Sequence, residues 1–76
     1  MRFVVLAFDA ALLPAGALRL GSVDTATSVR DRALRDGTFD GPASALTGIH
    51  VLEASDLDAV LDGLPATGTY EVRPAW

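Results

Sequence analysis

The chain has 76 residues, half of them hydrophobic, with ten acidic residues against six arginines, no lysine and no cysteine. This composition excludes a disulfide framework and a thiolate zinc site, and a net charge of −4 lacks the basic field that nucleic acids attract. We therefore expect a single domain over residues 1–76, no nucleic-acid partner and, because so small a body with this much apolar surface needs a further cover, a homodimer.

The first predicted element is a strand over Arg2–Phe8, which is apolar on both alternating faces. This pattern is typical of a central strand that is covered on both sides. Asp9 interrupts the apolar run long before the ~20 residues that a membrane span requires, and the start does not read as a secretory signal. We therefore expect no membrane segment and a cytoplasmic location.

Residues 9–16 include Pro14 and Gly16, which predict a turn or one short helical turn. Residues 17–23 and 25–31 then have moderate strand character, and we favour a β-hairpin in this part of the chain. The alternative is a short helix, because residues 28–31 resemble a capping box and a glycine follows at position 37.

Residues 49–53 form an apolar run that predicts the second central strand, and it contains the only histidine, His50. Strand alternation places His50 on the face opposite Ile49 and Val51. An imidazole titrates near neutral pH, so His50 is a candidate general acid or base. The alternative, which we favour because no triad spacing accompanies it, is a partly buried ring satisfied by a hydrogen bond.

A helix is predicted over residues 55–63, with Ser55 as its N-cap and a stop at Gly63. Its apolar stripe consists of Leu57, Val60, Leu61 and Leu64. Residues 69–73 alternate apolar and charged side chains, which predicts a half-buried strand whose pairing ends at Pro74 because proline offers no N–H.

Three further side chains are candidates for binding. The tripeptide Asp40-Gly41-Pro42 predicts a turn, in which Asp40 either bonds its own backbone or faces a cleft as an acceptor or base. Arg30 and Arg73 can each meet an anionic ligand bidentately, although pairing with a nearby acid such as Asp31 or Glu71 is the more common outcome. No metal motif or phosphate-binding glycine loop is recognisable, so we expect no metal and no cofactor.

Residues 48–61, the tripeptide at positions 40–42 and the tail at residues 70–76 together resemble the YCII-related family, in the subgroup named for its Asp-Gly-Pro-Phe motif. The resemblance implies an α+β, ferredoxin-like fold with an antiparallel sheet, arranged as a dimeric α/β barrel. The first helix of that fold falls on residues 9–16, so it is expected to be truncated or missing. Ala43 replaces the phenylalanine of the family motif, which removes an aromatic wall of the expected ligand pocket.

Catalytic members of this family resemble one another in a histidine on the first helix and an aspartate before a proline after the last helix. Here residues 9–16 contain no histidine, and Leu64 precedes Pro65. We therefore expect a homodimeric module that is not catalytic and binds a small organic ligand in a cleft between two sheets, lined by His50, Asp40 and Arg30. The alternatives are a small lyase or isomerase that uses His50, and a regulatory or scaffold protein. Trp76 is expected to pack across the subunit boundary.

Overall fold

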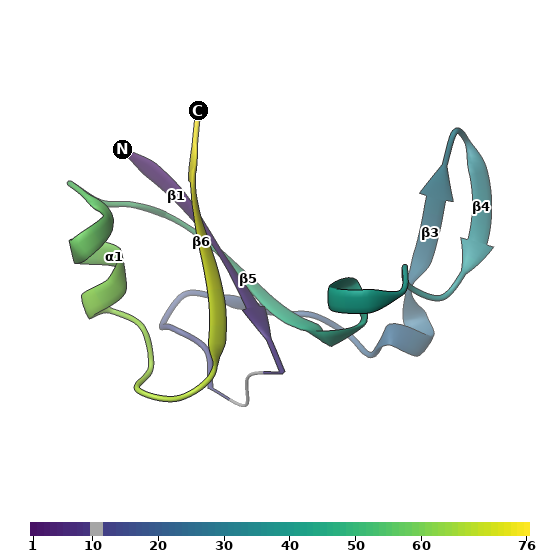
Figure 1. Ribbon diagram of the computed structural model, residues 1–76, viewed down its shortest axis with the longest axis horizontal. Coiled ribbons are helices and arrows are strands. Elements are labelled where there is room, and N and C mark those ends of the chain that lie inside the picture. The colour runs from purple at the N-terminus through teal and green to yellow at the C-terminus, as the bar shows by residue number, and fades with distance from the viewer. Residues whose placement is uncertain (10–11) are drawn as a thin grey trace.

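The computed structural model describes residues 1–9 and 12–76, and over these residues the chain is an α+β protein (Figure 1). A four-stranded antiparallel sheet has the order β2-β5-β1-β6, one short helix lies on one of its faces, and a two-stranded hairpin projects from it. The elements are β1 (Arg2–Phe8), β2 (Leu18–Arg19), β3 (Thr27–Arg30), β4 (Ala33–Asp36), β5 (Leu46–Glu53), α1 (Leu57–Asp62) and β6 (Thr69–Ala75), with short 3₁₀ turns at Val23–Thr25 and Gly41–Ala45.

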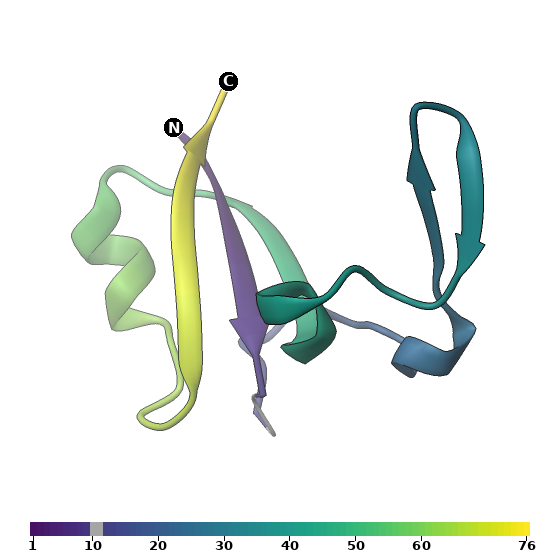
Figure 2. The same ribbon diagram turned by 45° about the vertical axis from the view of Figure 1, so that its right-hand side comes forward.

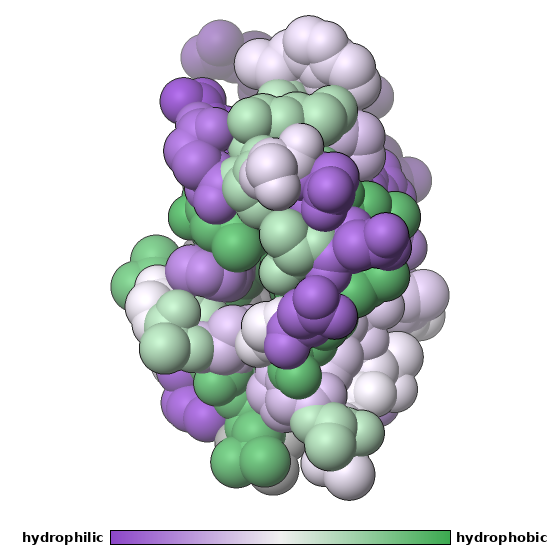
Figure 3. All heavy atoms as spheres, turned by 90° about the vertical axis from the view of Figure 1, so that its left-hand side faces the viewer, coloured by the Kyte–Doolittle hydropathy of each residue, from purple (hydrophilic) through white to green (hydrophobic). Residues whose placement is uncertain are grey.

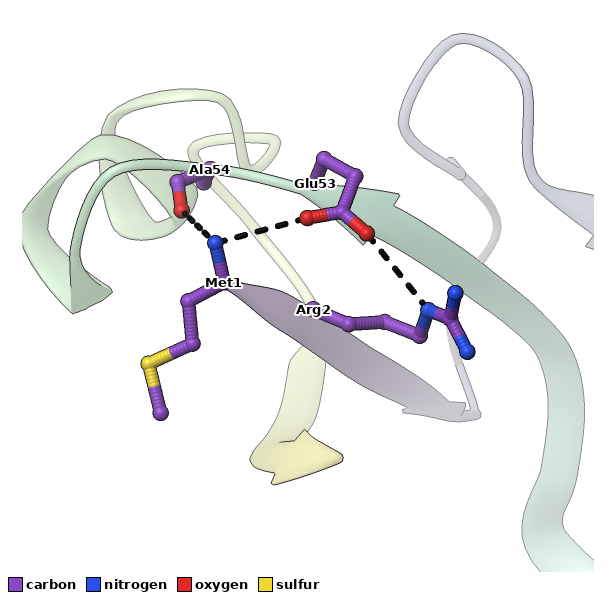
Figure 4. Close-up of polar contacts among 4 residues, drawn as sticks. All are labelled: Met1, Arg2, Glu53 and Ala54. Atoms are coloured by element: carbon purple, nitrogen blue, oxygen red, sulfur yellow. Dashed lines mark hydrogen bonds and ion pairs between the residues drawn. The ribbon is translucent and has the colours of Figure 1, made fainter. Parts of the chain in front are cut away.

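The centre of the sheet is β1, as its pattern predicts, because β5 and β6 pair with it on either side. Its alternate residues Phe3, Val5 and Ala7 are buried on the face that α1 covers, where Val60 completes the core (Figure 2). At the start of β1, the Met1 amino group lies 3.0 Å from the Ala54 carbonyl oxygen, which holds this end of the strand against β5 (Figure 4). Glu53 contacts the same amino group at 3.3 Å and the Arg2 Nε at 3.5 Å.

Helix α1 is shorter than the sequence predicts, and its N-cap lies one residue later. Its N-cap is Asp56, whose Oδ1 accepts a hydrogen bond of 2.9 Å from the Ala59 N–H, so the assignment of this role to Ser55 was wrong. Six residues make fewer than two turns, so Val60 alone of the helical residues is buried against the sheet. Leu57 and Leu61 remain about half exposed, and Figure 3 shows hydrophobic and hydrophilic side chains interleaved over this side of the molecule.

Among the described residues, no α-helix lies over the opposite face of the sheet. Val4 and Leu6 of β1 lie directly opposite Val51 and Ile49 of β5, so these four apolar side chains share that face. Leu18 of β2 pairs with Ile49 and extends the row; its side chain is 69% exposed and that of Val51 is 55% exposed. We call this surface the open sheet face.

The region before the hairpin departs from the predicted strands. Within residues 17–23 only Leu18 and Arg19 form a strand. Ser22 then caps the 3₁₀ turn that follows, because its hydroxyl oxygen accepts from the Asp24 N–H at 3.2 Å. A serine that bonds its own local backbone ends an extended run, which explains why the predicted strand is cut short. The helical turn considered for residues 9–16 falls partly on residues 10–11, which lie outside the described residues, and residues 12–16 contain no helix.

The hairpin, which we call the arm, consists of β3 and β4, so residues 27–30 form a strand and not the start of a helix. The two predicted strands do not pair with each other, because β3 pairs with β4 and β2 pairs with β5. The turn of the arm is at Asp31 and Arg32, both with positive φ, and this matches the two-residue turns that suit twisted antiparallel strands. At its base the Gly37 N–H donates to the Ala26 carbonyl at 2.8 Å, and the Ser28 hydroxyl donates to the Gly37 carbonyl at 2.6 Å. Figures 1 and 2 show that the arm projects away from the sheet.

Strand β6 continues through Pro74, which lies opposite Phe3, and reaches Ala75. The prediction that Pro74 ends the pairing was therefore wrong. Because β6 is an edge strand, half of its N–H groups point away from β1, and a proline is tolerated there. The predicted alternation is confirmed, since Tyr70 and Val72 are half-buried while Glu71 and Arg73 are exposed.

Candidate functional site

The predicted site residues lie in three places. Arg30 and Asp40 line one groove beside the arm, His50 lines a separate pocket beside α1, and Arg73 lies on the edge strand β6. A single chain therefore brings two of the predicted cleft residues together and leaves His50 apart from them.

The groove beside the arm has a volume of about 490 Å³ and is called the arm groove here. Arg30 and Arg35 both stack on Phe39, with their guanidinium carbons 5.3 and 5.9 Å from the centre of its ring. Arg35 also donates from Nη2 to the Thr38 carbonyl at 3.1 Å. The groove is lined by Ser28, Arg30, Ala33, Leu34, Arg35, Phe39 and Asp40.

The two arginines of the arm groove have no acidic partner among the residues that the structure describes. Outside the groove, Glu53 forms ion pairs with Met1 and Arg2, and Glu71 forms one with Arg73. Asp40 lines the same groove, but it makes no capping hydrogen bond to the 3₁₀ turn that it precedes. The backbone after it is fixed, because Gly41 has φ of +77° and Pro42 starts the turn. The groove thus combines two guanidinium groups with one carboxylate, and each of the three can make further hydrogen bonds.

The pocket beside α1 has a volume of about 260 Å³ and is called the helix pocket here. Its walls come from β1, β5, α1 and the loop before β2, and His50 is the titratable side chain among its lining residues. The lining residues are Val5, Pro14, Ala15, His50, Leu52, Ala59, Val60, Gly63 and Leu64. It is the hollow left where a loop, rather than a second helix, faces this side of the sheet.

Local contacts hold that loop in place. The Tyr70 hydroxyl donates to the Leu12 carbonyl at 2.9 Å, and a Cβ added to Gly48 would lie only 2.6 Å from the Leu13 Cδ2. Gly16 has φ of +88° and passes close to His50, since a Cβ there would lie 3.2 Å from the imidazole Cε1. A side chain at position 48 would collide with Leu13, and one at position 16 would be crowded by His50 in a backbone conformation that favours glycine.

His50 itself is half-buried, and its ring makes no hydrogen bond or ion pair with another described residue. The expected hydrogen bond that would satisfy a purely structural imidazole is therefore not formed within residues 1–9 and 12–76. No second acid or base lines the helix pocket with it. The arrangement offers one proton donor or acceptor in an apolar hollow.

Arg73 has an acidic neighbour. Its Nε pairs with the Glu71 Oε2 two residues earlier, on the same side of β6, and both side chains are largely exposed. Exposed pairs of this kind contribute little stability, on the order of 0–1 kcal/mol. The pairing matches the alternative weighed for this arginine, and Arg73 lines neither of the two hollows described above.

Two residues of the arm groove, Arg35 and Phe39, were missed by sequence reasoning. The available signal was the period of a strand, because pairing residues 27–30 with residues 33–36 sets Arg35 opposite Ser28 and on the same face as Arg30. Phe39 immediately precedes Asp40, so a turn that directs one into the groove also brings the other near.

The described part of the chain holds no group of three or more His, Cys, Asp or Glu residues that could bind a metal ion. None of its helices is long and apolar enough to cross a lipid bilayer. Comparisons of the chain with protein-family models, with curated proteins and with solved structures gave no match.

Proposed function

We propose that this chain is a homodimeric module of YCII-related, ferredoxin-like type that binds a small organic ligand and has no chemistry of its own. The observation that carries the proposal is the open sheet face. An apolar row across three strands, with Leu18 and Val51 more than half exposed, is the kind of surface that marks a contact with another molecule.

A second copy is the simplest cover, because two such faces are identical and can pack sheet to sheet about 10 Å apart. The edge of this face also suits a dimer. Arg73 and Glu71 of β6 pair with Val4 and Leu6 of β1, so charged groups border the apolar row on the β6 side. Trp76 follows β6 directly and is 96% exposed, and a large aromatic side chain there supports a contact across the subunit boundary.

The dimer is tested by changing two exposed apolar side chains, one on the open sheet face and one on α1, which lies over the other face. We expect Val51→Asp to place a charge on the open sheet face and to give a monomer. The matched control is Leu57→Asp, which changes a similarly exposed side chain on α1 and is expected to leave the dimer intact. Light scattering at micromolar concentration gives the masses, and a monomeric parent protein would overturn the proposal.

The main support for the absence of catalysis is the separation of the candidate acid and base groups. His50 lies in the helix pocket and Asp40 lies in the arm groove, so they do not form a proton-transfer pair within one chain. A module that holds ligands needs no such pair.

A second candidate function is a small lyase or isomerase, favoured by the unbonded His50 ring in an apolar hollow. Such a ring is available for general acid or base catalysis, which typically contributes about 10²–10⁴-fold in rate. A screen of small organic acids for turnover, repeated with His50→Ala, separates the two functions. Turnover that is lost in a folded His50→Ala protein establishes the enzyme, whereas the module shows no turnover before or after the change.

A further inference from the structure

We infer that the arm groove is a binding site for a small organic carboxylate that also carries a hydrogen-bond donor, such as a hydroxyl group. The inference rests on the proposed ligand-binding function and names the class of ligand. It requires neither the dimer nor His50, because every residue involved lies between Ser28 and Asp40 of one chain.

The carboxylate end of this ligand is indicated by Arg30 and Arg35. Two like charges are held beside one aromatic ring, and no acid within ion-pair distance neutralises either of them among the residues described. Both guanidinium carbons lie over the Phe39 ring, and among the described residues the hydrogen bond from Arg35 to the Thr38 carbonyl is the one that these two groups make. Most of their N–H groups are therefore available to a ligand. Those groups match the geometry of a carboxylate, which can accept two parallel hydrogen bonds from a guanidinium.

The donor end is indicated by Asp40. A simple anion would be repelled by this carboxylate, so a ligand that suits the whole groove must offer it a hydrogen-bond donor. Ser28 does not compete for this role, because its hydroxyl donates to the Gly37 carbonyl at 2.6 Å. Ala33 and Phe39 line the groove together with these polar groups, which suits a ligand with a hydrocarbon or aromatic body.

The probe for this site is 4-hydroxybenzoate, with benzoate and phenol as comparison compounds that each lack one polar group. Binding is followed by ¹⁵N–¹H correlation spectra of the whole chain during titration, at low ionic strength. We expect shifts confined to amides of residues 28–40, with 4-hydroxybenzoate bound more tightly than either comparison compound.

Variants test the two ends of the site separately. Arg30→Gln is expected to weaken 4-hydroxybenzoate about fivefold or more, since it removes a charge-assisted contact. Arg32→Gln is the matched control, because it removes the same charge from the tip of the same arm without lining the groove, and it is expected to leave the affinity within about twofold. Asp40→Asn is expected to erase the preference for 4-hydroxybenzoate over benzoate.

Equal losses in Arg30→Gln and Arg32→Gln would overturn the inference, because they would show attraction to arginine charge in general. Shifts around His50 instead of the arm would also overturn it, while leaving the proposed ligand-binding function standing. The mass of each variant, measured on the same samples, reports the dimer independently, so failure of the dimer and failure of this site are told apart.

Discussion

The sheet with its helix, which we call the body, and the arm are held together by different interactions. The body buries Phe3 and Val5 together with Val60, which lies more than fifty residues further along the chain. The arm rests on a local turn, a hydroxyl bond from Ser28 and the stacking on Phe39. A two-stranded hairpin is marginally stable alone, so the arm is expected to open at a lower free energy than the body. The arm, which is the less buried part, therefore carries Arg30 and Arg35, two charged groups without an acidic partner among the described residues.

The largest effect is expected from truncating the same residue type in the two regions. Phe3→Ala should lower the free energy of unfolding by about 3–5 kcal/mol, because Phe3 is 3% exposed and leaves a cavity in the core. Phe39→Ala should cost far less, since that ring is 38% exposed and lies outside the core. Urea unfolding followed by circular dichroism measures the free energy of unfolding of both variants. Equal losses of stability would contradict the difference between body and arm.

The next effect concerns the base of the arm. Ser28→Ala leaves the Gly37 carbonyl without its donor in a partly buried place, and should cost the arm about 1–2 kcal/mol. Ser44→Ala is the control, because it removes a bond of similar length, 2.7 Å to the Gly41 carbonyl, in an exposed place. Hydrogen exchange should show the loss of protection at β3 and β4 alone. A comparable loss throughout β1 would mean that the arm and the body open together.

Within the body, the helix cap distinguishes the observed helix start from the predicted one. Asp56→Ala should lower stability by about 1 kcal/mol, since the Asp56 carboxylate caps the Ala59 N–H. Ser55→Ala should have almost no effect on the same unfolding midpoint. The reverse ranking would restore Ser55 as the cap.

The smallest effect, and the only gain in stability, is expected at the tip of the arm. Arg32 has φ of +69°, a conformation that costs an L-residue on the order of 1 kcal/mol and glycine nothing. Arg32→Gly should therefore stabilise the arm by up to about 1 kcal/mol. The gain is reduced because glycine raises the conformational entropy of the unfolded chain. Asp31→Gly should gain less, because aspartate tolerates this region better. We expect slower hydrogen exchange at the amides of β3 and β4 in Arg32→Gly. Faster exchange would contradict the prediction that the Arg32 backbone is strained.

Much of the body could be predicted from the sequence because its signals are periodic. The two apolar faces of Arg2–Phe8 indicate a central strand, and β1 has those bounds. The short elements were harder, because local bonds of Ser22 and Asp56 decide where they begin and end. Neither bond leaves a period in the sequence, so composition alone could not choose between neighbouring residues.

The candidate site was predictable by residue type but not by location. Arg30 and Asp40 are ten residues apart and meet because a two-residue turn reverses the chain between them. His50 was placed with them only by assuming one cleft, whereas β5 directs it to the face that α1 covers. Alternation gives the face of a residue relative to its neighbours in the strand, but the pairing of distant segments decides which other side chains share that face.

The pairing of β1 with β6 also affects the order in which the strands can pair during folding. The first strand of the chain is completed by its last, since Arg2 lies opposite Ala75 and Phe8 lies opposite Thr69. Long-range pairing of this kind closes slowly, so one edge of β1 stays unpaired until β6 reaches it, although β5 and α1 can already contact this strand. The arm, which closes over only two residues, can form and break many times in that interval. An unpaired strand edge can pair with another chain, so we expect aggregation to be most rapid while β1 lacks its pairing with β6.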